Sequence, residues 1–209
     1  MKISVNVEAE LPTDSANYEV LAEGVKRASP VEGLTCEIGL RRGGGSKVII
    51  DALVETKQHL SKAHVAVDPY GDIAYQETDA RTVRLDYTND MRDECLMNMY
   101  LYCRARKVNF CFFNLEDTEF FKRFADGVPV YDKSKRVVNT YSFVHFDGPH
   151  AVGPLKTEIA FFNDRTRPGA VFVFDDVNSY DHAAIDQALK SMGWELYRTT
   201  DRKWAYFKK

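Results

Sequence analysis

Short runs of apolar residues alternate along the chain with longer segments in which apolar residues return every three or four positions. The short runs end in glycine, proline or polar residues and are typical of buried strands, whereas the longer period predicts amphipathic helices. The runs predicted as strands cover residues 34–40, 64–70, 108–114, 141–147 and 169–176, and two further strands are expected over 194–209. The segments predicted as helices cover residues 14–28, 46–60, 88–106, 117–127, 152–164 and 179–193.

Capping residues mark several of the predicted helix ends. Asp14 or Ser15 suits the N-cap of the first helix, and Ser179 suits the N-cap of the last. Gly127 and Gly193 follow the helices over 117–127 and 179–193, and glycine is the commonest residue just past a helix C-terminus.

Alternation of strands and helices, with strands that are apolar throughout, predicts a doubly wound, mainly parallel α/β sheet covered by helices on both faces. With 209 residues, 44% of them hydrophobic, the chain is long enough for one such core. We therefore expect a single domain over residues 34–209 and an N-terminal helical segment, residues 1–33, that packs on it. In sheets of this kind ligands bind beyond the carboxyl ends of the strands.

Composition and charge argue against several classes of partner. The formal net charge of −3 does not favour electrostatic binding to the phosphate backbone of nucleic acid. No apolar run approaches the roughly 20 residues that span a bilayer, and the N-terminal segment lacks the apolar core of a signal peptide. The four cysteines form no CxxC pair, so we expect reduced thiols in a cytoplasmic protein, although their even number leaves a disulfide open.

The first strand leads into a glycine-rich loop. Glu37 and Gly39 lie at the strand tip, and Gly43 to Gly45 precede a helix that opens at Ser46. Glycines allow close backbone approach, and a helix N-terminus suits a carboxylate or phosphate. Asp68 ends the next strand, where an acidic side chain can accept ribose hydroxyls. A flexible loop and a turn-starting aspartate are the alternatives, and taken together the groups favour a nucleoside-binding edge.

Three carboxylates end two later strands. Asp147 ends one strand, and Asp175 and Asp176 end the next. Burying them together is costly unless a cation neutralises them, and oxygen ligands select Mg²⁺, Mn²⁺ or Ca²⁺. His150 follows three residues after Asp147 and could accept a proton from a substrate hydroxyl. The alternatives are a helix N-cap for the Asp pair and a loop histidine bonded to backbone.

These motifs resemble those of class I S-adenosylmethionine-dependent methyltransferases, and more narrowly the metal-dependent, macrocin-type sugar O-methyltransferases and their small relatives. The resemblance covers nearly the whole chain from about residue 35 and rests on the segments EIGLRRGGGS, VDPYGDI, FVHFDGPH and VFDD. It implies a seven-stranded sheet whose last strand inserts antiparallel. It also implies Mg²⁺ held by Asp147, Asp175 and Asp176, with His150 as the base. The residues implied to contact the cofactor are Glu37, Gly39, Gly43, Ser46, Asp68, Glu116 and Asp117.

The sequence departs from the family pattern at the glycine loop, which has one glycine more, and at Pro149, where a second aspartate is common. The expected activity is metal-dependent methyl transfer from S-adenosylmethionine to a hydroxyl of a sugar or small natural product. A methyltransferase acting on nitrogen or carbon, a metal-dependent hydrolase and a catalytically silent cofactor-binding module remain as alternatives. The sequence does not identify the acceptor, and it leaves the oligomeric state open, a homo-oligomer included.

Overall fold

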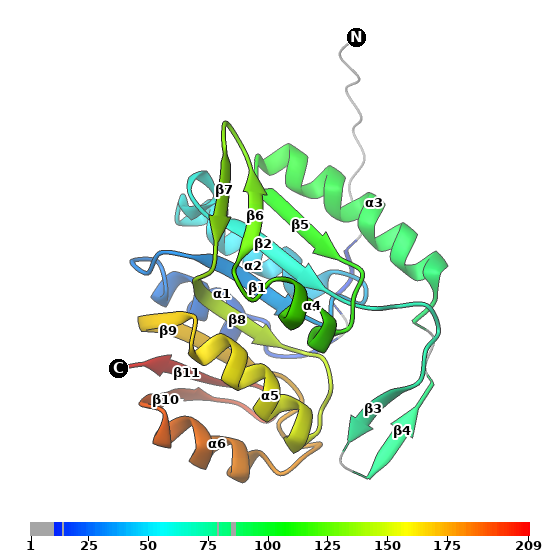
Figure 1. The fold of residues 1–209 in the computed structure, drawn as a ribbon, viewed down its shortest axis with the longest axis vertical. Coiled ribbons are helices and arrows are strands. Elements are labelled where there is room, and N and C mark those ends of the chain that lie inside the picture. The colour runs from blue at the N-terminus through cyan, green and yellow to red at the C-terminus, as the bar shows by residue number, and fades with distance from the viewer. Residues whose placement is uncertain (1–10, 14, 79, 85–86) are drawn as a thin grey trace.

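A seven-stranded sheet forms the centre of the computed structural model, which describes residues 11–13, 15–78, 80–84 and 87–209, with only the backbone described over 76–78 (Figure 1). The strand order is β10-β11-β9-β8-β1-β2-β5. The strands are β1 (Leu34–Ile38), β2 (Ala63–Val67), β5 (Asn109–Phe113), β8 (Tyr141–Phe146), β9 (Thr166–Phe174), β10 (Trp194–Thr199) and β11 (Trp204–Lys208).

The pairing directions confirm the predicted fold class. Strand β1 lies between β2 and β8 and runs parallel to both, and the parallel pairing continues to β5 and β9. Strand β11 inserts between β9 and β10 and is antiparallel to both. The carboxyl ends of β1, β2, β5, β8 and β9 therefore meet at one edge of the sheet, where a ligand is expected.

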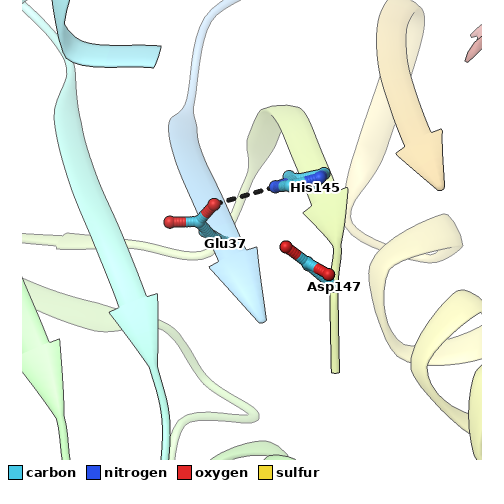
Figure 2. A group of neighbouring side chains, drawn as sticks. All are labelled: Glu37, His145 and Asp147. Carbon is cyan, nitrogen blue, oxygen red and sulfur yellow. Dashed lines mark hydrogen bonds and ion pairs between the residues drawn. The ribbon is translucent and has the colours of Figure 1, made fainter. Parts of the chain in front are cut away.

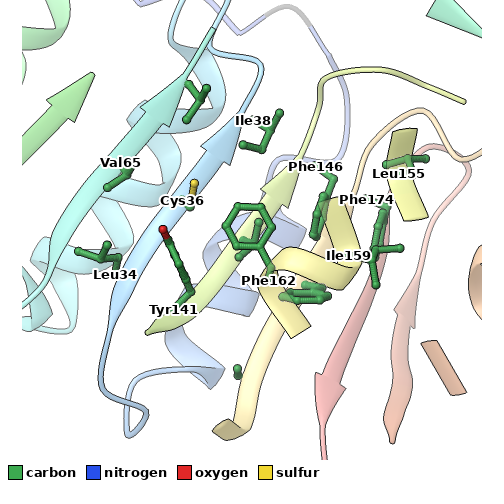
Figure 3. Packing of buried hydrophobic residues seen from close by; sticks show 14 of the residues in the cluster. Leu34, Cys36, Ile38, Val65, Tyr141, Phe146, Leu155, Ile159, Phe162 and Phe174 are labelled. Atoms are coloured by element: carbon green, nitrogen blue, oxygen red, sulfur yellow. The ribbon is translucent and has the colours of Figure 1, made fainter. Parts of the chain in front are cut away.

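Helices cover both faces of the sheet. One face packs on α1 (Glu19–Arg27), α2 (Gly44–Glu55) and α3 (Asn89–Arg106), and the other on α4 (Asp117–Arg123), α5 (Val152–Asn163) and α6 (His182–Ser191). On the second face, aromatic rings dominate the core: Phe146 stacks on Phe174 with ring centroids 4.5 Å apart, and Phe162 meets Phe146 edge to face (Figure 3). Such pairs add to the stabilisation from burial itself.

Three of the predicted helix starts were wrong, those of α1, α2 and α6. Helix α6 begins at His182, and its N-cap is Asp181, whose Oδ1 accepts from the Ala184 N–H at 3.3 Å. Ser179 lies in the preceding turn and donates to the Asp176 carbonyl. Helix α2 begins at Gly44 and ends at Glu55, and a 3-10 turn, η1 (Gln58–Leu60), follows it.

The first helix begins at Glu19, and its N-cap Tyr18 makes no side-chain capping bond. Asp14, one of the two predicted caps, lies outside the described residues, as do residues 1–10. Helix α1 packs through Val20, Leu21 and Val25 on the side chains of β8, β9 and α2. The division into residues 1–33 and 34–209 stays a prediction.

Two hairpins were not predicted: β3 (Tyr75–Thr78) with β4 (Arg81–Val83), and β6 (Val128–Tyr131) with β7 (Lys135–Val138). Each lies outside the main sheet (Figure 1). Within the described part of the chain, no helix combines the length and apolarity needed to cross a membrane.

Candidate functional site

A cavity of about 370 Å³ opens at the carboxyl edge of the sheet. It gathers most of the site residues predicted from five different strand ends, namely Glu37, Gly39, Asp68, Glu116, Asp117, Asp147, His150, Asp175 and Asp176. Gly43 and Ser46, also predicted to contact a ligand, are not among the lining residues, whereas Gly44 and Gly45 are. The sequence pattern therefore located one continuous site.

The glycine loop is shaped by close approaches that leave no room for side chains. Gly39 has φ +89°, and a Cβ there would overlap the backbone oxygen of Asp147. A Cβ on Gly45 would overlap a carboxylate oxygen of Glu37. Gly43 takes the left-handed N-cap position of α2 with φ +82° and faces Met99 of α3. The loop thus brings the backbone at the start of α2 directly against the cavity.

Beneath this loop lies a chain of buried polar side chains. The Ser46 hydroxyl donates to Glu37 Oε2 and lies 2.7 Å from Nε2 of His64. The other ring nitrogen of His64 lies 2.9 Å from the Thr35 hydroxyl. All four side chains are at most 1% exposed. Ser46 is therefore a support for Glu37, one layer behind the cavity wall.

His145 links this chain to the carboxylate end of the cavity. Its Nδ1 lies 2.8 Å from Glu37 Oε1, and Asp147 lies close to both side chains (Figure 2). Burial lowers the pKa of His145, but the Glu37 hydrogen bond and the Asp147 charge outweigh it and raise that pKa above its ordinary value. The ring is fully buried, and its Nε2 has no hydrogen-bond partner in the part of the chain that the structure describes.

Burial of His64 predicts a loss of stability in acid. Desolvation and the nearby His145 charge lower the pKa of His64 from 6.5 to about 3. Between these two pH values the unfolded chain binds a proton at this ring and the folded chain does not, so the free energy of unfolding falls as the pH falls. From pH 7 to pH 5 we expect His64 alone to remove about 2 kcal/mol, measured by denaturant titration.

The variant His64→Gln isolates this effect. It can keep one hydrogen bond of the ring but cannot titrate, so its stability should fall less than that of the wild type between pH 7 and pH 5. The matched control is His59→Gln, which replaces a half-buried histidine whose Nδ1 lies 3.4 Å from the Leu53 carbonyl oxygen, and it should follow the wild type. Equal pH dependence in wild type and His64→Gln would contradict this assignment.

Asp68 ties the second strand end to the glycine loop. Its Oδ2 accepts from the backbone N–H groups of Leu40 and Arg41, both at 2.9 Å, and its Oδ1 accepts from the Tyr70 N–H at 3.0 Å. A carboxylate can accept about four hydrogen bonds, and Asp68 already accepts three. Oδ1 keeps room for a ligand hydroxyl, while most of the acceptor capacity of Asp68 orders the loop.

The third strand end carries Glu116 and Asp117, and Asp117 opens α4. Behind Asp117 lies Glu158 of α5, which is fully buried and, among the described residues, has no hydrogen-bond partner at either carboxylate oxygen. Burial and the Asp117 charge raise the pKa of Glu158 well above its ordinary value. Burial therefore disfavours the negatively charged form of Glu158 beside the cavity.

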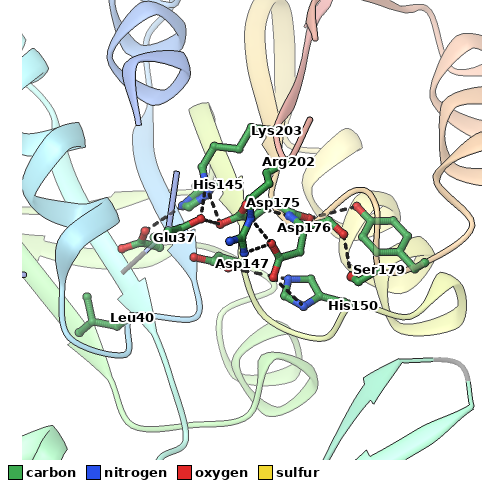
Figure 4. Close-up of polar contacts among 12 residues, drawn as sticks. Glu37, Leu40, His145, Asp147, His150, Asp175, Asp176, Ser179, Arg202 and Lys203 are labelled. Carbon is green, nitrogen blue, oxygen red and sulfur yellow. Dashed lines mark hydrogen bonds and ion pairs between the residues drawn. The ribbon is translucent and has the colours of Figure 1, made fainter. Parts of the chain in front are cut away.

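At the carboxylate end, Asp175 and Asp176 are paired with basic side chains (Figure 4). Asp175 Oδ2 lies 2.7 Å from Lys203 Nζ and accepts from the Ser15 hydroxyl at 3.0 Å. Asp175 Oδ1 accepts from the Asp176 N–H at 2.7 Å. Asp176 Oδ1 accepts from Nε of Arg202 at 2.7 Å and from its Nη2. Both basic residues come from the turn between β10 and β11.

Asp147 and His150 face the cavity with fewer partners. His150 lies between two carboxylates, with Nε2 3.8 Å from Asp147 Oδ1 and Nδ1 3.9 Å from Asp176 Oδ2. Its ring lies parallel to that of Tyr180 with centroids 6.1 Å apart. Burial and the Asp175 charge raise the pKa of Asp147 to about 6. This carboxylate and this imidazole are the groups best placed to exchange a proton with a ligand.

The predicted set of three carboxylate ligands does not fit a metal ion as the side chains stand. Both oxygens of Asp175 are engaged, and one oxygen of Asp176 is held by Arg202. Among the described residues, the one group of three or more acidic, histidine or cysteine side chains at ligand spacing is Glu37, His145 and Asp147, with ligand atoms within 4.8 Å of one another. Lys203 and Arg202 already supply the positive charge that the sequence analysis assigned to Mg²⁺.

Sequence reasoning missed four groups that shape this site: His145, Ser15, Arg202 and Lys203. His145 lies inside an apolar strand, where histidine gives no signal of its own. Ser15 and Arg202 line the cavity, and Lys203 contacts Ser15 and Asp175, only through tertiary structure. Strand β11 inserts beside β9 and brings the turn with Arg202 and Lys203 to the strand ends, whereas Ser15 comes from the segment before α1. The one available signal was the basic pair in the polar turn of the last hairpin.

Comparison with known proteins places the fold among methyltransferases. No protein-family model matches the sequence, and no curated protein matches it. Among solved structures, the O-methyltransferase NovP is 17% identical with a TM-score of 0.63, covering 92% of this chain and 79% of that chain. The calicheamicin methyltransferase CalS11 is 11% identical with a TM-score of 0.60, covering 91% of this chain and 77% of that chain.

A third structure is the O-methyltransferase from Bacillus cereus in complex with SAH, which is 12% identical with a TM-score of 0.58 and covers 95% of this chain and 84% of that chain. At these identities the likeness shows a shared fold. The predicted resemblance to class I methyltransferases, sugar O-methyltransferases among them, is thereby confirmed at the level of the fold.

Proposed function

We propose that this chain is an S-adenosylmethionine-dependent O-methyltransferase whose acceptor is a hydroxyl of a sugar or small natural product. The observation that carries the proposal is the single cavity at the carboxyl edge of a methyltransferase-type sheet, in which a glycine loop, Asp68, Asp147 and His150 converge. The O-methyltransferase structures with the same fold support it.

The residues of the glycine loop suit the amino-acid part of the cofactor. The first N–H groups of α2 lack acceptors within the helix, and Gly44 and Gly45 expose this end to the cavity, so they can bind a carboxylate. Glu37, buried beside the cavity, supplies negative charge for an ammonium group. Asp68 offers Oδ1 to a ribose hydroxyl, and Glu116 and Asp117 line the far side, where adenine would lie.

The cofactor supplies an electrophilic methyl group when bound. Around it, His150 accepts the proton of the acceptor hydroxyl, and Asp147 and Asp176 on either side orient its ring. Tyr75 and Tyr87, whose rings lie 5.6 Å apart, form an aromatic wall that can pack on a sugar or a phenol. Enclosure by these side chains brings the acceptor oxygen in line with the methyl group.

The Mg²⁺ ligand roles of Asp147, Asp175 and Asp176 stay a prediction from the sequence, and the proposed mechanism does not use an ion, because the donor set found here does not fit one. We further propose a small-molecule or saccharide acceptor in the cytoplasm, without nucleic-acid or membrane partners.

The variant Asp68→Ala should weaken binding of S-adenosylhomocysteine. It removes the carboxylate that accepts hydrogen bonds from the backbone N–H groups of Leu40, Arg41 and Tyr70 and that is proposed to contact the ribose. Hydrogen bonds to a charged group contribute about 1.5–3 kcal/mol each. We expect affinity to fall by a factor of about 10 to 100, measured by titration calorimetry. Asp72→Ala, an exposed aspartate of the following turn, is the matched control and should bind as the wild type does. Unchanged affinity of Asp68→Ala would remove the residue from the cofactor site.

The proposal as a whole is tested by label transfer. The protein is incubated with S-adenosylmethionine carrying a labelled methyl group and a panel of nucleotide sugars, glycosides and phenols, with primary amines and an activated phosphodiester included. Label on a hydroxyl compound supports the proposal. Label on amines alone, or cleavage of the phosphodiester without label transfer, would favour the nitrogen-methyltransferase or hydrolase alternative instead.

A further inference from the structure

Two neighbouring basic side chains stand at the place in the cavity where a divalent cation was predicted. Lys203 is 0% exposed, and its Nζ lies 2.7 Å from Asp175. Arg202 donates hydrogen bonds to Asp176 Oδ1 from its Nε and Nη2 atoms. A buried lysine is tolerated only beside a well-placed counter-charge. Figure 4 shows both side chains entering the cluster of carboxylates from the same side.

We propose that Arg202 and Lys203 replace the divalent ion in this site, so that methyl transfer needs no bound metal and Arg202 contacts the acceptor oxygen. The inference rests on the proposed function, because it names how that site handles negative charge on the acceptor. It differs from the expectation drawn from the sequence, in which three aspartates hold Mg²⁺.

Both carboxylate oxygens of Asp175 already have hydrogen-bond or ion-pair partners. Asp175 has one oxygen bonded to Lys203 and Ser15 and the other to the Asp176 backbone. A divalent ion bound to Asp175 would have to displace Lys203 or lie beside its positive charge. At 4 Å two unit charges interact by about 4 kcal/mol at a dielectric constant near 20, and a divalent ion roughly doubles this repulsion.

The two basic residues have different roles. Lys203 is fully enclosed and does not line the cavity, so it is a positioning residue that fixes Asp175 and Ser15. Arg202 lines the cavity, its side chain is 35% exposed, and its Nη1 has no hydrogen-bond acceptor in the described part of the chain. Arg202 therefore has a free donor beside His150 for an oxygen that becomes negative.

The reaction balances without an ion. The acceptor O–H bond breaks and its proton passes to His150. A bond forms between the acceptor oxygen and the methyl carbon, and the methyl–sulfur bond breaks with its electron pair remaining on sulfur. Arg202 donates a hydrogen bond to the acceptor oxygen while the O–H bond breaks, which is the charge stabilisation that a metal ion would otherwise provide.

Mn²⁺ titration followed by electron paramagnetic resonance tests the inference on the full chain. Wild-type protein should leave the signal of free Mn²⁺ unchanged, with no site tighter than about 10⁻³ M. Arg202→Met removes the guanidinium and releases Asp176 next to Asp147. It should therefore bind Mn²⁺ at least roughly tenfold more tightly than the wild type, because a cation beside the site is gone. Arg202 is half-exposed, so this variant should fold, which circular dichroism checks.

Arg198→Met is the matched control, because it removes another arginine of the same strand pair that faces a carboxylate, Glu23, outside the cavity. It should leave Mn²⁺ binding at the wild-type level. Micromolar Mn²⁺ binding by the wild type that Asp175→Asn abolishes would overturn the inference. So would failure of Arg202→Met to gain any binding.

S-adenosylhomocysteine binding, measured on the same wild-type sample without metal, keeps the two proposals apart. If the wild type does not bind S-adenosylhomocysteine, the proposed function is contradicted, and the Mn²⁺ titration then tests only whether the site binds a metal ion. Cofactor binding together with a tight wild-type Mn²⁺ site would retain the methyltransferase and overturn the replacement of the ion.

Discussion

Replacing His150 with alanine should lower turnover of the accepted substrate by about 10²–10⁴-fold, the range that a general base contributes, or about 3–5 kcal/mol in the barrier. His150 is the one imidazole on the cavity lining, and it lies 3.8 Å from Asp147 and 3.9 Å from Asp176. Asp176 cannot replace it without moving, because its Oδ1 is held by Arg202. The measurement is kcat with the best acceptor from the label-transfer panel, at saturating cofactor.

His59→Ala is the control for this variant, because His59 is a half-buried histidine beyond α2 that does not line the cavity. It should turn over at the wild-type rate. His150→Ala should still bind S-adenosylhomocysteine, since the residue lies at the acceptor end. Wild-type turnover by His150→Ala would reject its role as base, and loss of cofactor binding would instead mark it as a structural residue.

Replacing Lys203 with methionine should lower the free energy of unfolding by about 3–5 kcal/mol, the cost of leaving a buried charge without its partner. Lys203 is 0% exposed, the Asp175 side chain is 2% exposed, and their charged atoms lie 2.7 Å apart. Methionine keeps the length of the stem, so packing is largely preserved. Denaturant titration at pH 7 gives the difference.

The double variant Lys203→Met with Asp175→Asn separates the ion pair from packing. With both charges removed, no unpaired carboxylate remains, and the double variant should recover most of the loss seen in Lys203→Met. Lys209→Met is the matched control, because its 2.8 Å pair with Glu195 is largely exposed and should contribute less than about 1 kcal/mol. A double variant no more stable than Lys203→Met would place the effect in packing alone.

Hydrophobic periodicity was enough to predict the parallel sheet, because each of its central strands is a short apolar run buried on both faces. The same strands end in polar residues, and their shared direction places those residues in one cavity. Helix starts were less predictable: Ser179 and Asp181 both have capping side chains, and only the local backbone decides that Asp181 caps α6.

What the sequence could not reveal depends on contacts between distant segments. Ser15 and Lys203 are far apart along the chain, yet both contact Asp175. Counting only carboxylates at the strand ends therefore predicted a need for a metal ion that the fold meets with its own cations. The hairpin of β3 and β4, which contributes Tyr75 to the cavity wall, was also missed, because its strands are short and mostly polar.

The most direct test of the central claim is titration calorimetry of the wild-type protein with S-adenosylhomocysteine, first with Mg²⁺ and then with excess EDTA. The glycine loop, Glu37 and Asp68 are expected to bind the compound in both conditions with micromolar affinity, about −8 kcal/mol. Binding in both would support the cofactor site and its independence from metal. No binding in either would contradict the methyltransferase account.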